Sequence, residues 1–423
     1  MFSSRTNWHL EPNRFTRALE SHRRGGAPLF DLTASNPTTC GFAYPQKEIL
    51  AALADPRALQ YAPESKGLLE AREAIAEYYR GRASAMGSPQ ARSAPAEVDA
   101  QRILLTSGTS EAYSWVFRLL CEPGDEVLVP APSYPLFEFL ANLADVNLVS
   151  YPLTYQEGSQ EKGWRIDLDA LGAALTPRSR AVLVVHPNNP TGSFVSRREA
   201  AQLADLCARR DMALVADEVF LDFAKEVAED SAQDEAQDDA LAAAGASFPG
   251  TFALQDVALT FTLSGLSKVC ALPQMKLAWL AVSGPETLVR PAVDRLEIIA
   301  DTYLSPNTPV QLAVPRFLAL RGAIQEQLQR RIAANLTCLD AALQASPSVT
   351  RLARQGGWYA VLRVPALMPD DEIAVALIER ESVLVHPGQF FDFAQDGFLI
   401  LSLITREEEF QEGVRRMLRF LSR

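Results

Sequence analysis

The stretch Leu263-Ser-Gly-Leu-Ser-Lys268 places a lysine behind a serine and glycine turn, at the end of an apolar run. A second cation, Lys276, follows about two helical turns later. A lysine amine can form a Schiff base with an aldehyde cofactor, and a phosphate on that cofactor needs a cationic partner. A surface lysine after a strand gives the same local pattern, because Ser/Gly/Lys turns are common. The interpretation of Lys268 therefore depends on the rest of the chain.

Length and composition indicate a globular protein of two domains. A chain of 423 residues is longer than one hydrophobic core usually accommodates, so two closely packed domains are expected. A hydrophobic content of 48% with 22% charged residues is ordinary for a soluble protein. The net charge of −12 and the lack of a Lys/Arg run argue against a nucleic-acid partner. A phosphate-bearing small molecule would therefore need a local cationic site.

The cysteines and the sequence ends bear on the compartment. The cysteines are scattered, without the spacing of metal-binding motifs, which favours reduced thiols and no metal centre. They are Cys40, Cys121, Cys207, Cys270 and Cys338. The first residues lack the pattern of a signal peptide, and no apolar run reaches about 18 residues. We therefore expect a cytoplasmic protein without a membrane span.

Continuous apolar runs alternate with helical patterns through the middle of the chain. Such runs imply a mostly parallel sheet covered on both faces, and a capping box of Ser196 and Glu199 predicts one of the covering helices. In such sheets ligands bind outside the carboxyl ends of the strands. The residues at the predicted strand ends are Gly108, Tyr134, Asn189, Asp217 and Lys268. The polar side chains are thus expected to converge on one site.

The domain organisation follows from where the pattern changes. Residues 1–50 are expected to form an N-terminal arm and part of a small domain, and residues 51–310 a large domain. Residues 311–423 are expected to complete the small domain. Residues 83–100 are interpreted as a loop, and residues 225–250 as an acidic, solvated insertion in the large domain. Docking of a basic partner on this insertion is a weaker alternative.

Three motifs occur together and in order along the chain. They are Asn189-Pro-Thr-Gly192, Asp217-Glu-Val-Phe220, and Ser267-Lys268 followed by Lys276. With them the sequence resembles, over nearly its whole length, the class I/II aminotransferases of the fold type I pyridoxal 5′-phosphate enzymes. The resemblance implies an α/β fold with a mostly parallel central sheet flanked by helices. It also implies a smaller α+β domain built from both termini.

The resemblance implies a role for each polar strand end. Lys268 would form the Schiff base with pyridoxal 5′-phosphate and, once released, shuttle a proton between substrate and cofactor. Asp217 would pair with the protonated pyridine nitrogen and favour the charged ring. Asn189 would hydrogen-bond the 3-oxygen, and Tyr134 would stack on the ring. The implied reaction moves an amino group between a small-molecule amino donor and a carbonyl acceptor.

The resemblance also implies a phosphate site and a dimer. The implied phosphate-binding residues are Gly108, Thr109, Ser110, Ser267 and Lys276. Tyr61 matches the tyrosine that reaches the phosphate of the neighbouring subunit in this family, which implies a homodimer with active sites at the interface. His186 precedes one motif but is interpreted as structural, because Lys268 already supplies the acid and base.

Several residues depart from the family pattern. Phe220 replaces the usual tyrosine, which should raise the pKa of the Schiff base. Lys276 replaces an arginine and offers a point charge instead of a bidentate fork. Gly265 stands where a phosphate-binding serine is common.

The largest departure concerns the substrate carboxylate. Ile400 replaces the arginine that holds it in the family. Arg406 or the backbone near Asn36 could hold the carboxylate instead, with Lys66 and His386 as weaker candidates.

Several functional hypotheses remain open on sequence alone. The chain could be an aminotransferase that binds the carboxylate by another group, or one for amines and aldehydes that lack an α-carboxylate. It could be a lyase or decarboxylase, since an apolar environment promotes loss of a carboxylate. A non-catalytic regulatory relative is a hypothesis of another class, because a fold does not fix a function. Family frequency favours transamination.

Overall fold

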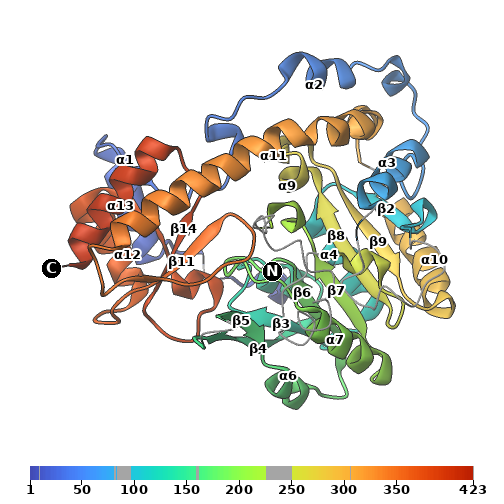
Figure 1. The fold of residues 1–423 in the computed structure, drawn as a ribbon. Helices are drawn as coiled ribbons and strands as arrows, with labels where there is room; N and C mark the ends of the chain where they lie inside the picture. Colours follow the sequence, from blue (N-terminus) through green and yellow to red (C-terminus); the bar gives the residue numbers. More distant parts are fainter. Residues whose placement is uncertain are drawn as a thin grey trace, which may run out of the picture.

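The structure is a computed structural model, and it describes residues 1–8, 10–80, 82, 97–158, 162–224, 250–304 and 306–422. The predicted loop at 83–100 and the predicted acidic insertion at 225–250 lie almost entirely outside the described residues. Figure 1 shows the arrangement of the elements. The described α-helices are α1 (Arg14–Arg24), α2 (Gln46–Ala52), α3 (Leu69–Tyr79), α4 (Thr109–Leu120), α5 (Phe137–Leu143), α6 (Leu168–Ala174), α7 (Arg197–Arg209), α9 (Leu266–Val269), α10 (Glu286–Tyr303), α11 (Thr308–Leu343), α12 (Asp370–Glu381) and α13 (Glu407–Leu421).

An eight-stranded sheet forms the centre of the molecule, in the order β2-β9-β8-β7-β6-β3-β4-β5. Neighbouring strands from β8 through β4 run parallel, whereas β9 runs antiparallel to β2 and β8, and β5 antiparallel to β4. The strands are β2 (Ile103–Thr106), β3 (Glu126–Ala131), β4 (Asn147–Gln156), β5 (Gly163–Ile166), β6 (Ser179–Val185), β7 (Ala213–Asp217), β8 (Thr260–Gly265) and β9 (Ala278–Ser283). The predicted mostly parallel sheet is confirmed.

The central strands β6, β7 and β8 are almost entirely buried because helices cover both faces of the sheet (Figure 1). In β7, Leu214 and Ala216 pack into the core on one face, and Ala213 and Val215 pack into the core on the other. All residues of β7 are buried. Helix α7 begins with the predicted capping box, in which Ser196 Oγ accepts from the Glu199 N–H at 3.2 Å.

A second, smaller sheet is built from the C-terminal part of the chain, and a short two-stranded sheet ties the N-terminal part to the same region. Its order is β10-β11-β14-β13, and a separate two-stranded sheet pairs β1 with β12. These strands are β1 (Phe30–Asp31), β10 (Thr350–Arg351), β11 (Tyr359–Arg363), β12 (Val383–Leu384), β13 (His386–Pro387) and β14 (Phe398–Ser402). Helix α11 runs from the large sheet to this region (Figure 1). The division at residues 50 and 310 stays a prediction.

The topology gathers the polar turns at one edge of the large sheet. The carboxyl ends of β3, β6, β7 and β8 meet there because these strands are parallel. Strand β9 runs the other way, so its first residue, Ala278, pairs with both Thr106 at the end of β2 and Gly265 at the end of β8. The turn before β9, which carries Lys276, therefore lies at the same edge.

Candidate active site

Lys268 lies in the single turn of α9, directly after β8, and its side chain is half-buried. Its Nζ atom is 4.7 Å from the centroid of the Trp358 ring and 5.5 Å from that of Phe220. Burial lowers the pKa of Lys268 to about 8, although the nearby Asp217 carboxylate opposes this shift. Within the described residues, Nζ makes no hydrogen bond or ion pair. At pH 7 about a tenth of the amine is therefore neutral, far more than for a lysine with the ordinary pKa of about 10.4.

Asp217, the last residue of β7, is 6% exposed. Its Oδ2 accepts a hydrogen bond from the Tyr113 hydroxyl at 2.7 Å, and its Oδ1 accepts one from the Val219 N–H at 3.1 Å. Burial raises the pKa of Asp217, while the two hydrogen bonds and the charge of Lys268 act against the rise. The carboxyl group is thus fixed in orientation, and a cation placed against it would favour its charged form.

The loop after β6 contains two asparagines: the side chain of the first is fully hydrogen-bonded, and the side-chain oxygen of the second lacks a hydrogen bond in the described structure. Asn188 accepts from Ser133 Oγ at 3.1 Å and donates to the Pro132 carbonyl at 3.1 Å and to Thr191 Oγ1 at 2.9 Å. Asn189 is 8% exposed, and its side-chain oxygen is buried without a hydrogen bond in the described structure. A buried polar atom of this kind is costly unless a ligand satisfies it.

Tyr134 lies at the same edge, in the turn after β3. Its ring meets that of Phe137 edge to face, with centroids 5.6 Å apart. Burial raises the pKa of Tyr134 to about 12, and the charges of Asp217 and Tyr359 act in the same direction. Tyr134 is therefore a neutral phenol close to both the Asp217 carboxyl group and the small sheet.

The candidate phosphate site combines a helix start with a cation. Gly108 is the N-cap of α4, and the first N–H groups of a helix, here those of Thr109 and Ser110, have no partner within the helix. A Cβ atom built on Gly108 would lie 3.8 Å from Lys276 Nζ. Lys276 is exposed and adopts a left-handed backbone, with φ of 51°. Gly108, Thr109 and Lys276 are thus near one another, as the motif predicts.

Two further predicted phosphate ligands lie beside these residues in the chain. Ser110 follows Thr109 in the first turn of α4 and is exposed. Ser267 precedes Lys268 in α9 and is half-buried. Their contribution to a phosphate site stays a prediction.

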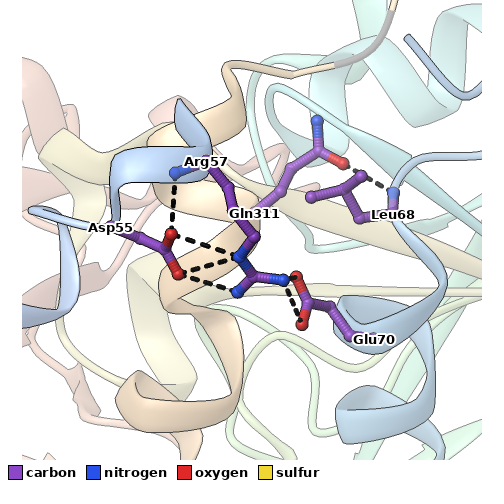
Figure 2. A network of polar contacts seen from close by, with 5 residues as sticks. All are labelled: Asp55, Arg57, Leu68, Glu70 and Gln311. Atoms are coloured by element: carbon purple, nitrogen blue, oxygen red, sulfur yellow. Dashed lines mark hydrogen bonds and ion pairs between the residues drawn. The ribbon is translucent and has the colours of Figure 1, made fainter. Parts of the chain in front are cut away.

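Tyr61 projects from the molecule, with 82% of its surface exposed. Figure 2 shows how the chain on both sides of it is held: Arg57 hydrogen-bonds Asp55 and, at 3.0 Å, Glu70 of α3. The Leu68 N–H donates to the Gln311 side chain of α11 at 2.7 Å. The arch that carries Tyr61, residues 57–68, is therefore anchored at its two ends, and no hydrogen bond, ion pair or ring contact among the described residues joins Tyr61 to the phosphate-site residues.

His186 is fully buried and serves the structure, as predicted. Its Nδ1 accepts from the Val195 N–H at 3.1 Å, and its Nε2 lies 3.0 Å from the Gly250 carbonyl, to which it donates. Burial lowers the pKa of His186 to about 4, which keeps the ring neutral. Glu218, next to Asp217, turns the other way and accepts from the Phe252 N–H at 2.6 Å.

The predicted substrate ligands are not brought to Lys268 by any contact among the described residues. The Asn36 side-chain oxygen accepts from the Thr38 N–H at 3.1 Å and caps a short 3₁₀ turn. Arg406 is exposed at the start of α13, next to Gly41. Lys66 donates to the Gln101 carbonyl at 3.3 Å. The assignments of Asn36 and Arg406 to substrate stay predictions without a supporting contact.

The fourth candidate, His386, lies directly opposite Ile400 in the small sheet. Its Nδ1 is buried without a partner in the described structure, and burial lowers the pKa of this histidine. It therefore places a neutral imidazole, not a cation, beside Ile400.

Sequence reasoning missed two aromatic residues that shape the site. Tyr113 lies one helical turn past Gly108 in α4 and orients Asp217. Trp358 follows a glycine pair at the start of β11 and covers Lys268 Nζ. An aromatic residue directly after a Gly-Gly pair was a usable signal for the second, whereas a buried tyrosine in an apolar helix carries none.

Comparison with known proteins identifies the family. The profile described as aminotransferase class I and II matches residues 27–417, which is most of the chain. The chain belongs to the class I and II aminotransferases. Members of this family use pyridoxal 5′-phosphate as cofactor.

Among similar curated proteins, the glutamate-pyruvate aminotransferase AlaA of Escherichia coli (strain K12) is 26% identical over 410 residues, covering 94% of this chain and 91% of that protein. The alanine aminotransferase of Mycobacterium tuberculosis (strain H37Rv) is 26% identical over 415 residues, covering 95% and 86%. The alanine aminotransferase structure from Pyrococcus furiosus shares the fold, with a TM-score of 0.82, 22% identity and 100% coverage of both chains. None of the described helices could cross a lipid bilayer.

Proposed function

We propose that this class I/II aminotransferase binds pyridoxal 5′-phosphate and transfers an amino group between a small-molecule amino donor and a carbonyl acceptor. The observation that carries the proposal is that Lys268 and Asp217 lie near each other, at the ends of two adjacent parallel strands, β8 and β7. Burial leaves the amine with a pKa of about 8, and the carboxylate close by is held rigidly. A reactive amine beside a fixed anion suits an aldehyde cofactor with a cationic ring.

The residues present fit this cofactor. The buried side-chain oxygen of Asn189, which has no partner in the described structure, could accept from a ring hydroxyl. Gly108, Thr109, Ser110, Ser267 and Lys276 would hold the phosphate, since free N–H groups, hydroxyls and a cation all favour an anion. When bound, pyridoxal phosphate supplies an aldehyde that reacts with amines and a ring that accepts an electron pair from the substrate.

The protein side chains would then handle charge and protons. The amine of Lys268 can take a proton from the substrate carbon and return it, because its pKa of about 8 is close to working pH. Asp217 would stabilise a positive ring nitrogen, and Tyr134 would hold the ring by stacking. Trp358 and Phe220 place aromatic surface against Lys268 Nζ.

A second candidate substrate class is favoured by Ile400. This side chain is fully buried and pairs with Val361 in the small sheet, so it shares a face with Tyr359, two residues before Val361. Tyr359 in turn raises the pKa of Tyr134, which means that the two tyrosines lie close to each other. The wall of the site is therefore apolar where a carboxylate would need a cation. We propose amines or amino alcohols without an α-carboxylate as alternative donors to α-amino acids.

The absorbance spectrum of the cofactor tests the function and the substrate class together. The protein loaded with pyridoxal phosphate is titrated with alanine, glutamate and matched amines that lack the carboxylate, and we expect at least one donor to convert the cofactor to its amino form. In Ile400→Arg, preference should move toward α-amino acids by at least about tenfold, the value of one charged hydrogen bond. Failure of every donor would contradict transamination. An unchanged preference in the variant would show that position 400 does not face the substrate.

We also propose that the chain works as a homodimer in the cytoplasm. Tyr61, which is 82% exposed, is two residues from Leu59, which is 91% exposed, and both belong to the anchored arch of residues 57–68. An exposed tyrosine beside an apolar side chain suits burial against a second copy, whose phosphate site Tyr61 would reach. Sedimentation equilibrium should give twice the chain mass of 46.3 kDa. A monomer at micromolar concentration would contradict the role proposed for Tyr61.

A further inference from the structure

A groove outside the candidate active site runs along the middle of α11. It has a volume of about 610 Å³ and is bounded on its other side by Phe223, Ala224 and the turn that follows β10. Its polar lining includes Arg330, Arg351, Arg354, Glu326, Thr337 and Asp340. The lining contains three arginines and two acidic residues, so it carries an excess positive charge in a chain whose net charge is −12. Such a local excess attracts anions.

The charges of two of these arginines are already matched. Arg351 forms a bidentate pair with Asp340, through bonds of 2.6 and 2.8 Å. Arg330 Nη1 lies 3.9 Å from Oε2 of Glu326, which is one helical turn earlier in α11. The excess positive charge therefore belongs to Arg354.

Arg354 is held in place without an anionic partner among the described residues. Its Nη2 donates to the Gly357 carbonyl, while its Nε is buried and makes no hydrogen bond. A guanidinium group has five N–H donors in a rigid fork, so most of this donor capacity is unused. Arg354 as a whole is half-buried, and burial lowers its pKa to about 10. A guanidinium group whose Nε is buried without a partner is costly unless a ligand satisfies it.

The turn that carries Arg354 is joined to the candidate active site. The Gln355 and Gly356 N–H groups donate to the Gly192 carbonyl at 3.0 and 2.8 Å, at the end of the loop that contains Asn189. Gly192 has φ of 68°, and a Cβ atom there would lie 2.4 Å from the Gly356 carbonyl oxygen, so only glycine permits this contact. A ligand on Arg354 would thus brace a turn that leads directly to Trp358, above Lys268.

We propose that this groove binds a small oxyanion, a phosphate or a carboxylate, with Arg354 as its anchor. The planar fork of arginine matches the oxygens of both groups. The site is distinct from the candidate phosphate site at Gly108, and its occupancy would stabilise the turn between the Asn189 loop and Trp358. Binding to the groove does not depend on the reaction that the active site performs.

Calorimetric titration of the full chain tests the proposal. The protein is saturated with pyridoxal phosphate and freed of excess, so that the site at Gly108 is filled, and is titrated at constant ionic strength with inorganic phosphate and, separately, succinate. No amino donor or acceptor is present, so the outcome is independent of transamination. Arg354→Met should weaken binding at least about tenfold. Arg415→Met is the control: this arginine pairs with Glu412 outside the groove, and its replacement should leave binding unchanged.

Thermal unfolding separates a ligand role from a structural one. Without anion, Arg354→Met should unfold at or above the wild-type temperature, because a half-buried charge without an anionic partner among the described residues has been replaced by an apolar chain of similar length. Phosphate or succinate should raise the unfolding temperature of the wild type and not of this variant. Arg354→Lys, which keeps the charge without the fork, should bind with intermediate affinity.

The two anions distinguish the sources of the ligand. Binding of succinate alone, lost in Arg354→Met, would support the site and assign it to an organic carboxylate, and binding of phosphate alone would assign it to a phosphate. Binding of neither anion would overturn the proposal. Equal binding by Arg354→Met and Arg415→Met would also overturn it. So would a combination of two results: Arg354→Met is less stable than the wild type, and Arg354→Lys binds the anions with wild-type affinity.

Discussion

Lys268→Ala is expected to lose at least about 10³-fold in kcat with the best donor found for the wild type, because one residue supplies both the nucleophile and the proton carrier. Nothing else in the described site offers a free amine in this position: Trp358 and Phe220 surround Nζ with aromatic surface. Single-turnover absorbance measurements, made at saturating cofactor, separate this loss from weaker cofactor binding.

Lys276→Ala is the matched control for this experiment. It removes the other lysine of the site, which is exposed and lies close to Gly108. Loss of a phosphate contact should weaken cofactor affinity and leave turnover at saturation nearly intact. A Lys268→Ala variant that retained wild-type turnover would contradict the proposed chemistry and support the regulatory relative, whereas equal loss in both variants would point to general damage at this edge of the sheet.

The sheet and the edge that carries the site were predictable because they depend on patterns along the chain. Strands buried on both faces are mostly apolar, so β6 and β7 stand out as apolar runs that end abruptly, β6 before the turn with Asn189 and β7 at Asp217. Parallel strands then force those turns together. The position of Lys276 needed one more fact, the antiparallel direction of β9, which no local pattern of its sequence specifies.

Side-chain orientation was not predictable, since it is decided by residues far apart in the chain. Tyr113 and Asp217 are 104 positions apart, and only the packing of α4 on the sheet brings the hydroxyl within 2.7 Å of the carboxylate. Arg406 was a reasonable candidate by its distance from Ile400 along the chain. In the structure β14 ends before it, and Arg406 becomes the exposed start of α13, where its charge faces solvent.

Asp217→Asn is expected to lower kcat by about 10² to 10³, the usual effect of removing one preorganised electrostatic group from a site of developing charge. Its fold should tolerate the change. An asparagine oxygen can still accept from the Val219 N–H, and its amide can donate to the Tyr113 oxygen, so both contacts of the carboxyl group have replacements. Because a buried carboxylate with a raised pKa is removed, the unfolding temperature should stay equal or rise.

Glu218→Gln provides the control, because it neutralises the adjacent buried carboxyl group without touching the candidate site. Glu218 is fully buried and bonds Thr251 and Phe252, away from Lys268. Burial raises its pKa to about 7, so a neutral glutamine resembles a state that the native protein already populates at neutral pH. Its kcat should therefore remain close to wild type. Equal losses in the two variants would mean that total buried charge, and not the position of Asp217 opposite a cofactor ring, governs the rate, and the role assigned to Asp217 would be wrong.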